Sequence, residues 1–522
     1  MNDHATEVLI VGAGPTGLTL ACDLARRAIP HRIIERAPQP STASRAKTIQ
    51  PRALEVLDDL GAAARVVGRG VVDLPTRFHD ASGAVVDRPN IAARVGHPSE
   101  TPFPDPVWIA QFDMEAALRE RHTRWGGQVE FGVEATALQQ DAGGVDVEVV
   151  TGRGVQTIRA RYVVGADGGK SQVRHLVGLP LVGETYEDQR WYLGDVTAPG
   201  LDRGSMQVWT SPQGMIGLTP LPGSDLWQLQ SPIPAEIAEP APPSLALYQA
   251  MLDDRAGPGA VRLTSATWLS ISRVNVRMVE RYRRERVFLA GDAAHVHPAA
   301  GGRGMNTGIQ DAYNLGWKLA AVLEGADPAL LDTYEEERLP VARAVLEDSN
   351  RKMGRVQSTM RGESGSGLSG ALGSFSDDLT SGLSIAYPTS SLTLPLPAGP
   401  TSTLPAGRRA PNAAGLRGAQ FGGTVFDLLR GPQWTLLAFT DGPRPTLAGI
   451  DPSQVHVHQI GTREGSDLRD TTSETAQVYA PVGDELILIR PDGYLAARVP
   501  MSEEASIIGY LRPLLPDPLQ HA

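Results

Sequence analysis

The sequence predicts an α/β protein in which a parallel sheet is interrupted by an inserted antiparallel sheet and followed by a C-terminal domain. Short apolar runs at 8–11, 162–165 and 287–290 each lead directly into a turn that contains glycine. Residues 205–230 instead alternate apolar and polar side chains in three short runs, and a second α/β pattern follows residue 416. Parallel strands that are buried on both faces read as continuous apolar runs, whereas a meander reads as alternation, so two different sheets are expected.

Length and composition limit the class of protein. At ~100–200 residues per domain, 522 residues correspond to roughly three domains. A net charge of -11 argues against a nucleic-acid binder, which needs a basic face. No basic segment precedes the first apolar run and no run reaches about 20 apolar residues, so neither a signal peptide nor a membrane span is expected. The single cysteine, Cys22, excludes an intrachain disulfide and fits a reducing, cytoplasmic location.

The first element is a βαβ unit. Residues 8–11 (VLIV) predict a buried strand, and Pro15 suits the first turn of the helix that follows. Apolar residues recur at helical spacing from 18 to 28, and 31–35 (HRIIE) predict a second strand that ends in the acid Glu35. A strand that leads through glycines into a helix is the context that a nucleotide-binding turn requires.

The turn of this unit carries G-x-G-x-x-G, formed by Gly12, Gly14 and Gly17. In this motif the first glycine permits a tight turn, the second lets the backbone approach a pyrophosphate, and the third allows close packing of helix on strand. The helix N-terminus attracts phosphate charge, and Glu35, 18 residues after Gly17, is placed to accept hydrogen bonds from an adenosine ribose. Both NAD and FAD satisfy this pattern, so other motifs must decide between them.

Two later strand ends favour a flavin. One apolar run leads into 166–169 (ADGG), and the other leads into Gly291 and Asp292, which precede the glycine-rich segment 298–304. A reduced flavin carries negative charge at N1 and at the C2 carbonyl, whereas a nicotinamide ring does not, and a plain NAD dehydrogenase is therefore disfavoured. The backbone amides at the start of the following helix are placed to donate to such an anion, namely those of Gly304, Met305 and Asn306.

The chain is expected to form a nucleotide-binding domain in three segments, a substrate-binding domain in two, a linker and a C-terminal domain. A hairpin is also predicted where 145–150 meets 155–158. The Ser-, Gly-, Thr- and Pro-rich composition of the region after residue 356 indicates the linker. The nucleotide-binding segments are expected at 1–75, 101–180 and 271–356, the substrate-binding segments at 76–100 and 181–270, the helix and linker region at 357–415 and the C-terminal domain at 416–522.

The C-terminal domain shows a compact α/β pattern. Its apolar runs predict strands, and 502–504 (SEE) is expected to cap a final helix that extends through Leu511. Because Cys22 is the only cysteine, this domain has no CxxC pair and cannot carry out dithiol chemistry. Its expected role is structural packing or a contact in a homodimer.

Three motifs resemble those of a known family when they are taken together. They are GAGPTG at 12–17, GADGGKSQVR at 165–174 and AGDAAHVHPAAGGRGMNTGIQDAYNLGWKLA at 290–320. In this order they resemble the class A flavoprotein monooxygenases of the para-hydroxybenzoate hydroxylase and phenol hydroxylase type, over roughly residues 5–350. The C-terminal segment resembles the thioredoxin-like domain of phenol hydroxylase and of polyketide-tailoring hydroxylases, on 408–411 (RRAP) and 486–499 (LILIRPDGYLAARV).

This resemblance implies a Rossmann-type FAD-binding domain, an inserted substrate sheet and a thioredoxin-like C-terminal domain. It also implies that FAD is reduced by NADH or NADPH and reacts with O2 to give a C4a-hydroperoxide, which hydroxylates a phenolic or polycyclic, polyketide-like aromatic compound. Some relatives instead insert oxygen beside a carbonyl or across a double bond, and the motifs do not separate these reactions. A flavin-binding protein without turnover is a third alternative, disfavoured by the intact motif at 304–306.

The resemblance also implies roles for individual residues. Arg45 would lie near the flavin and pyrophosphate. It is the only residue to which a catalytic role is assigned, namely coupling the position of the flavin to its reduction. Arg303 departs from the family pattern, where related sequences commonly have glutamine. The residues implied to bind FAD are Gly12, Gly14, Pro15, Gly17, Glu35 and Arg36 at the ADP half, Arg45, Gln111, Asp167, Gly168, Gly291, Asp292 and Pro298 farther along, and Gly304, Met305 and Asn306 at the isoalloxazine.

Several residue patterns have simpler interpretations. His295 and His297 lack acid or cysteine partners at metal-ligand spacing, so no metal is expected and both are predicted to make loop hydrogen bonds. The acidic stretch 334–338 (YEEER) is expected to be a solvated helix face. Four tryptophans in or near the inserted sheet are predicted to be core residues, with an aromatic pocket as the alternative: Trp191, Trp209, Trp227 and Trp268.

Overall fold

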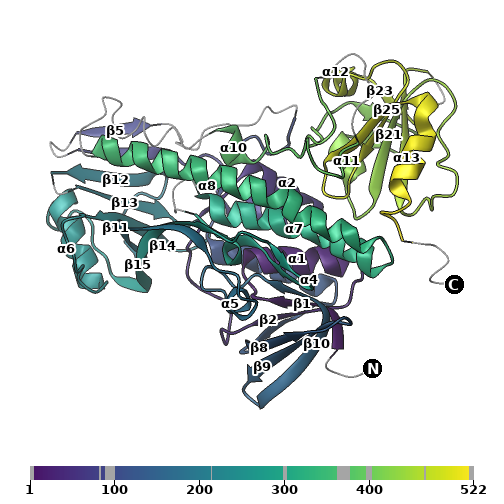
Figure 1. The fold of residues 1–522 in the computed structure, drawn as a ribbon. Helices are drawn as coiled ribbons and strands as arrows, with labels where there is room; N and C mark the ends of the chain where they lie inside the picture. Colours follow the sequence, from purple (N-terminus) through teal and green to yellow (C-terminus); the bar gives the residue numbers. More distant parts are fainter. Residues whose placement is uncertain are drawn as a thin grey trace.

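The fold places two long helices between two sheets and a C-terminal domain, as Figure 1 shows. Helices α7 (Arg303–Leu323) and α8 (Asp332–Met360) cross the middle of the molecule, and the C-terminal domain lies beside one end of them. The structure is a computed structural model that describes residues 5–80, 84–88, 100–212, 214–297, 302–360, 377–394, 403–463 and 466–516.

The three separated apolar runs share one parallel sheet, which confirms the prediction. β1 (Ala5–Val11) pairs in parallel with β2 (His31–Glu35) and with the second half of β10 (Gly154–Gly165). β10 also pairs in parallel with β17 (Val287–Leu289). The other strands of this sheet are β16 (Arg283–Arg284), β7 (Val129–Phe131), β8 (Glu134–Gln140) and β9 (Val145–Thr151), of which β9 forms the predicted hairpin with the first half of β10.

Helix α1 (Pro15–Arg26) packs against this sheet and against α7. It begins at Pro15, whose fixed φ suits a first helical turn. Cys22 of α1 is fully buried, and its thiol donates a hydrogen bond to the carbonyl of Leu118 at 3.3 Å. Burial raises the pKa of this thiol. Smaller elements of this domain are α2 (Pro51–Asp59), α3 (Ala63–Arg69), α4 (Gln111–Arg124), α5 (Gln172–Leu176), and the strands β3 (Thr48–Ile49) and β6 (Val107–Trp108).

The inserted sheet is a meander extended at both edges, which confirms the predicted alternation. α6 (Leu245–Ala256) covers one face, where Trp227 and Tyr248 are buried together. Trp209 is buried in the same core, as predicted, whereas Trp191 and Trp268 are half-buried. The sheet order is β18 (His295–Val296), β15 (Ser265–Met278), β11 (Val182–Thr197), β14 (Leu226–Ile233), β13 (Gly214–Pro220), β12 (Met206–Ser211), β4 (Thr76–His79) and β5 (Val85–Arg88). The boundary expected at residue 270 falls inside β15, because this strand stays paired with β11 as far as Met278.

The C-terminal domain is a mixed sheet with helices. Strands β21, β22 and β23 run parallel, and β24 and β25 add an antiparallel hairpin to them. Its elements are β19 (Leu416–Arg417), β20 (Gly422–Gly423), α11 (Val425–Leu429), β21 (Trp434–Phe439), β22 (Val455–Gly461), β23 (Leu468–Asp470), α12 (Glu474–Tyr479), β24 (Glu485–Ile489), β25 (Leu495–Pro500) and α13 (Glu504–Leu511). The predicted capping stretch 502–504 lies at the start of this helix: the chain leaves β25 through a 3-10 turn, Glu503 is the N-cap residue without a side-chain hydrogen bond, and α13 begins at Glu504.

The acidic stretch at 334–338 is not a solvated face, which corrects the prediction. Glu337 and Arg338 of α8 are almost fully buried, and only Glu336 among the three acids is exposed. Glu337 accepts hydrogen bonds from Arg490 of the C-terminal domain at 2.9 Å and from Lys318 of α7 at 2.7 Å. The C-terminal domain covers this side of α8, and the buried acid pairs with the cations that it meets there.

Parts of the expected linker are packed rather than free. It holds a short helix, α10 (Asp378–Ser381), and Ile385 and Tyr387 are buried beside α8. Farther on, Arg409 forms a buried ion pair with Glu55 of α2 at 3.0 Å. These contacts fix the path of the chain between the two domains. Among the helices of the described residues, none has both the length and the apolar character needed to cross a membrane.

The contact between His31 and His122 predicts that the free energy of unfolding decreases as the pH is lowered from about 6.5 to about 4. Nε2 of His31 and Nε2 of His122 are 2.8 Å apart, and Nδ1 of His31 lies 2.8 Å from the carbonyl oxygen of Ile29. Burial lowers the pKa of His31, and burial and His31 lower that of His122 to about 4. Because the unfolded value is about 6.5, the unfolded chain binds more protons between pH 6.5 and 4, and stability is lost as pH falls through that window.

We expect the free energy of unfolding of His122→Gln to decrease by about 1–2 kcal/mol less than that of the wild type when the pH is lowered through this window. The measurement is the free energy of unfolding in urea at pH 7.5, 6.5, 5.5 and 4.5, compared with the wild type. His175→Gln, at an exposed position, is the control and should retain the full dependence. Equal slopes for His122→Gln and the wild type would show that the pair does not link folding to proton binding.

Candidate active site

The turn after β1 contains two glycines packed against protein atoms and one glycine that faces open space. A Cβ atom built on Gly12, whose φ is +105°, would lie 2.4 Å from the carbonyl oxygen of Ala166, and one on Gly17 would lie 2.0 Å from that of Gly12. A Cβ on Gly14 would meet no atom within 4 Å. Gly12 and Gly17 are therefore glycines because protein surrounds them, whereas Gly14 borders open space at the N-terminus of α1. That space is where a helix N-terminus binds a phosphate.

Glu35 ends β2 beside this turn. Its carboxylate accepts hydrogen bonds from the backbone N–H of Ala13 and that of Ala37, both at 3.0 Å. The acid thereby fixes the geometry of the glycine turn while remaining only half-buried. Arg36, the next residue, is exposed.

The second motif lies against the first. Asp167 accepts hydrogen bonds from the N–H groups of Gln172 at 2.7 Å and Val173 at 3.1 Å, so its carboxylate caps α5. Gly168 has φ +80°, and a Cβ there would meet nothing within 4 Å. Arg174 of α5 donates to the carbonyl of Ala293 at 3.1 Å, which ties this motif to the third.

The third motif closes on the same point. Gly291, with φ +60°, and Gly308 of α7 approach Thr16 of α1 so closely that a Cβ on either would lie within 2.5 Å of its hydroxyl. Asp292 is exposed, and a Cβ on Gly304 would lie 3.3 Å from its Oδ1. The three sequence motifs, far apart in the chain, thus converge around the N-terminus of α1.

One side chain holds the first turn of α7 to the segment 48–50. Asn306 accepts a hydrogen bond from the N–H of Gln50 at 2.8 Å and donates to the carbonyl of Thr48 at 3.0 Å. Its amide is therefore engaged with the backbone, and the N–H groups of Gly304 and Met305 remain as donors at the helix N-terminus. Pro298, also predicted to lie at the flavin, is outside the described residues.

Arg45 lies in the loop 44–47, which leads into this segment. Its side chain is exposed, and its positive charge acts on the carboxyl groups of Asp292 and Glu115. Gln111 joins the loop to α4: it accepts from the N–H of Ala46 at 3.0 Å and donates to Glu115 at 2.8 Å. Burial raises the pKa of Glu115 to about 7, although Gln111 and Arg45 oppose the shift.

The two histidines form hydrogen bonds, as predicted. Nε2 of His295 lies 2.6 Å from Asp311, and its Nδ1 lies 2.9 Å from Nε2 of His297. Burial would raise the pKa of Asp311, but Arg338 and His295 lower it to about 2. Within the part of the chain that the structure describes, no group of three or more His, Cys, Asp or Glu side chains is placed to hold a metal.

Arg303, which differs from the glutamine common in the family, points toward α8 and α10. It is buried in an ion pair with Asp348 of α8 at 2.6 Å and contacts Asp377 at 3.4 Å. Its charge is therefore compensated by carboxylates between α8 and α10. The guanidinium anchors the start of α7 from behind.

Sequence reasoning missed a row of polar side chains on the inserted sheet. Asp195 of β11 is paired with Gln228 of β14, and Gln228 with Thr219 of β13. Directly paired residues point to the same face, so these three residues, the polar row, lie side by side opposite α6. Gln228 donates to the carbonyl of Ser44, and Asp195 accepts from the N–H of Ser44 at 2.6 Å. The signal was present, because an acid between apolar residues of a strand is rarely buried without a reason.

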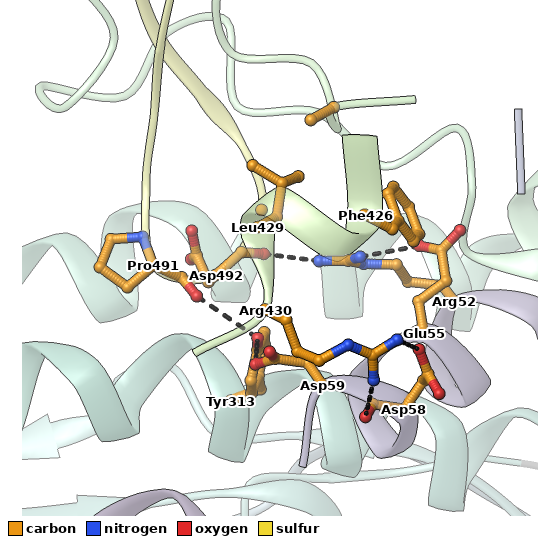
Figure 2. A pocket seen from close by; sticks show the side chains of 12 residues that line it. Arg52, Glu55, Asp58, Asp59, Tyr313, Phe426, Leu429, Arg430, Pro491 and Asp492 are labelled. Carbon is orange, nitrogen blue, oxygen red and sulfur yellow. Dashed lines mark hydrogen bonds and ion pairs between the residues drawn. The ribbon is translucent and has the colours of Figure 1, made fainter. Parts of the chain in front are cut away.

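A separate cleft lies between the first domain and the C-terminal domain (Figure 2). Arg52 donates to the carbonyl of Asp492 at 2.6 Å, and Arg430 contacts Asp58 at 3.0 Å. Its lining residues include none of those predicted to bind the cofactor. The cleft is therefore a polar interface between domains.

The residues around Gly14 fit FAD. The open space at Gly14 lies at a helix N-terminus, which suits a pyrophosphate, and the exposed Arg45 offers a positive charge that also acts on Asp292. The start of α7 adds a second set of backbone donors, and its dipole favours the negative charge of a reduced flavin.

The chain matches two family models and is similar to known flavin-dependent monooxygenases. A family model described as FAD binding domain matches residues 5–349, and one described as aromatic-ring hydroxylase, C-terminal, matches 403–517. A flavin-dependent monooxygenase of Mycobacteroides abscessus is 39% identical over 499 residues, covering 94% of this chain and 96% of its own length. The 6-methylpretetramide 4-monooxygenase of Streptomyces rimosus is 33% identical over 536 residues, covering 97% and 93%. The structure of aklavinone-11 hydroxylase with FAD and aklavinone matches 99% of this chain and 100% of its own, with 26% identity and a TM-score of 0.83.

Proposed function

Because this chain belongs to the FAD-binding aromatic-ring hydroxylase family, we propose that it hydroxylates a phenolic or polycyclic aromatic compound of the polyketide type, with NADH or NADPH as reductant. The FAD-dependent aromatic monooxygenase activity follows from membership of the family. The substrate class and the reductant are our proposal. They are supported by relatives named for 6-methylpretetramide and aklavinone.

The observation that carries the proposal is the contact between the polar row and the loop that bears Arg45. Asp195 and Gln228 both bind the backbone of Ser44, so the inserted sheet lies directly over this loop. On its other side the segment continues into Thr48 and Gln50, which hold Asn306 at the start of α7. The residues that fit the flavin and the polar face of the sheet therefore border the same segment of chain.

This arrangement assigns tasks to the protein. When bound, FAD supplies electron transfer from the reduced nicotinamide and activation of O2. The glycine turn and α1 bind the cofactor, and the first turn of α7 orients its ring. The inserted sheet would cover the bound substrate and exclude water, which would limit side reactions of the activated oxygen.

The test combines coenzyme oxidation with product mass. FAD-loaded protein is incubated with NADH or NADPH in air across a panel of phenols and hydroxylated polycyclic aromatics. We expect substrate-stimulated coenzyme oxidation and a product heavier by one oxygen, labelled when 18O2 is used. The structure of the product then separates ring hydroxylation from insertion beside a carbonyl or epoxidation. Bound, reducible FAD without a product from any phenol of the panel would contradict the proposal.

Arg45 is expected to act on flavin reduction. Its guanidinium is exposed, so it is available to a negative charge on the reduced ring or the nicotinamide phosphates. We expect Arg45→Ala to slow anaerobic flavin reduction at least about tenfold, equivalent to about 1.4 kcal/mol, while FAD stays bound. Stopped-flow absorbance of the flavin measures the rate. Arg124→Ala, on the exposed side of α4, should leave it unchanged, and Arg45→Lys should recover part of the loss.

A further inference from the structure

Lys47 brings a cation to one end of the polar row. Its Nζ donates a hydrogen bond to Thr219 at 3.0 Å, and its side chain is only half-buried. Burial lowers the pKa of Lys47 to about 7, although Asp195 opposes the shift. A lysine amine whose pKa is lowered toward neutral suits a general base.

Asp195 has one oxygen that the fold uses and one that it leaves free. Oδ2 accepts from the N–H of Ser44, but Oδ1 is buried and has no hydrogen-bond partner among the described residues. Burial raises the pKa of Asp195 to about 6, whereas Ser44 and Lys47 lower it. A role as anchor for loop 44–47 accounts for Oδ2 alone. A buried acceptor without a partner is costly, which indicates that Oδ1 has a role beyond folding.

We propose that Lys47, held by Thr219 and subject to the negative charge of Asp195, is the base that takes the proton of the substrate's phenolic hydroxyl. This inference rests on the proposed function, because it needs a phenol bound beneath the polar row. The residues are placed for it: the polar row faces away from α6 and over the loop next to Arg45. Lysine can serve as a base after desolvation, which arginine cannot.

The proposed step is a proton transfer. The O–H bond of the phenol breaks, its electron pair stays on oxygen, and the neutral Nζ of Lys47 forms a new N–H bond. The product is a phenolate paired with an ammonium, and no oxidant or reductant takes part. The phenolate is more electron-rich than the phenol, so its ring is more reactive toward an electrophilic oxygen. Asp195 stabilises the ammonium.

The charged groups near Lys47 and Asp195 determine whether the rate rises or falls with pH. Among the described residues, Asp195 is the charged group that acts on Lys47, and Lys47 is the one that acts on Asp195. Because the neutral amine is the active form, kcat/KM for a phenol should rise with pH through about 7, following Lys47. Removing the negative charge of Asp195 lowers the pKa of the amine, so this rise should move to lower pH.

The kinetic test uses the FAD-loaded full chain and the phenol hydroxylated best in the panel above. We expect Lys47→Met to lower kcat/KM on the order of 100-fold at pH 7 and to remove the rise near that pH. Lys47→Arg should keep KM within about threefold but lose kcat similarly, because guanidinium stays protonated. Asp195→Asn should shift the rise by about half a pH unit or more toward acid. Arg153→Met, at an exposed hairpin loop, is the control.

A binding test does not depend on turnover. Alizarin is a dihydroxyanthraquinone whose phenolate absorbs at longer wavelength than its neutral form, so difference spectra report its ionisation when it is bound. We expect the pKa of alizarin bound to the FAD-loaded wild type to lie at least about one unit below that of the free dye. In Lys47→Met the bound pKa should return toward the free value, with Arg153→Met unchanged.

These measurements separate the two proposals. A phenol that is hydroxylated with the same pH profile in the wild type and Lys47→Met would overturn the role of Lys47 and leave the proposed function intact. Alizarin that does not bind saturably, or is not ionised more readily in the wild type than in Lys47→Met, would also overturn it. An alizarin shift without hydroxylation of any phenol would instead support Lys47 and contradict the proposed function.

Discussion

Gly14→Val is expected to abolish FAD binding without unfolding the protein. In the FAD-free protein a Cβ at Gly14 meets nothing within 4 Å, and the residue has φ -78°, which valine can adopt. In the FAD complex the new side chain would occupy the space that suits the pyrophosphate. Loss of two charge-assisted hydrogen bonds, at about 1.5–3 kcal/mol each, raises Kd by at least about 100-fold.

Two glycine variants make this test specific. Gly152→Val places the same side chain in open space on a hairpin loop, and it should change neither FAD binding nor thermal stability. Gly12→Val should instead unfold or strongly destabilise the protein, because its φ is positive and its Cβ would clash with Ala166. The measurements are flavin fluorescence titration for Kd and the melting temperature of the FAD-free protein. Wild-type FAD affinity in Gly14→Val would place the cofactor elsewhere.

Glu337→Gln is expected to destabilise the protein by about 3–5 kcal/mol. The Glu337 carboxylate accepts from Arg490, Lys318, Asn314 and Ser390, all buried around it. Burial favours its neutral form, but Arg490 and Lys318 lower its pKa, so the group stays ionised. An amide leaves two buried cations with only part of their compensation, and breaking a buried pair costs more than its formation gains.

The adjacent residue supplies the control for this variant. Glu336 is exposed and hydrogen-bonds Ser391 at the surface, so Glu336→Gln should cost no more than about 1 kcal/mol. Calorimetry and denaturant unfolding of both variants measure the difference. Limited proteolysis near the linker should also become faster in Glu337→Gln alone, since Arg490 belongs to the C-terminal domain. Equal stability of the two variants would show that the buried network does not hold the domains together.

Local patterns in the sequence predicted the elements whose partners are close in the chain. The first βαβ unit, the β9–β10 hairpin and the meander were all found from periodicity and turn residues. Each buries or pairs its side chains with neighbours a few residues to a few tens of residues away. In such cases the chain itself carries the register, because turn chemistry and alternation determine which residues face each other.

The errors and omissions share a different cause. The prediction that Glu337 faces solvent is wrong because its buried partner Arg490 lies 153 positions farther along the chain. The polar row was missed because Asp195 meets Ser44 from 151 positions away. Neither contact can be recognised from sequence periodicity. A segment that is distant in the chain can bury a residue without changing the residues next to it in the sequence. The resemblance to a family identified the cofactor motifs, but it did not single out Lys47 or Asp195.

The burial of Cys22 makes the protein suitable for site-specific labelling. It is the only cysteine of the chain, it is fully buried in α1, and burial raises the pKa of its thiol, so maleimides and other thiol reagents find no reactive partner. A cysteine introduced at exposed Val155 or Val482 would therefore carry the whole label. A donor and an acceptor fluorophore at those two positions would report, in single molecules, the distance between the first domain and the C-terminal domain during turnover.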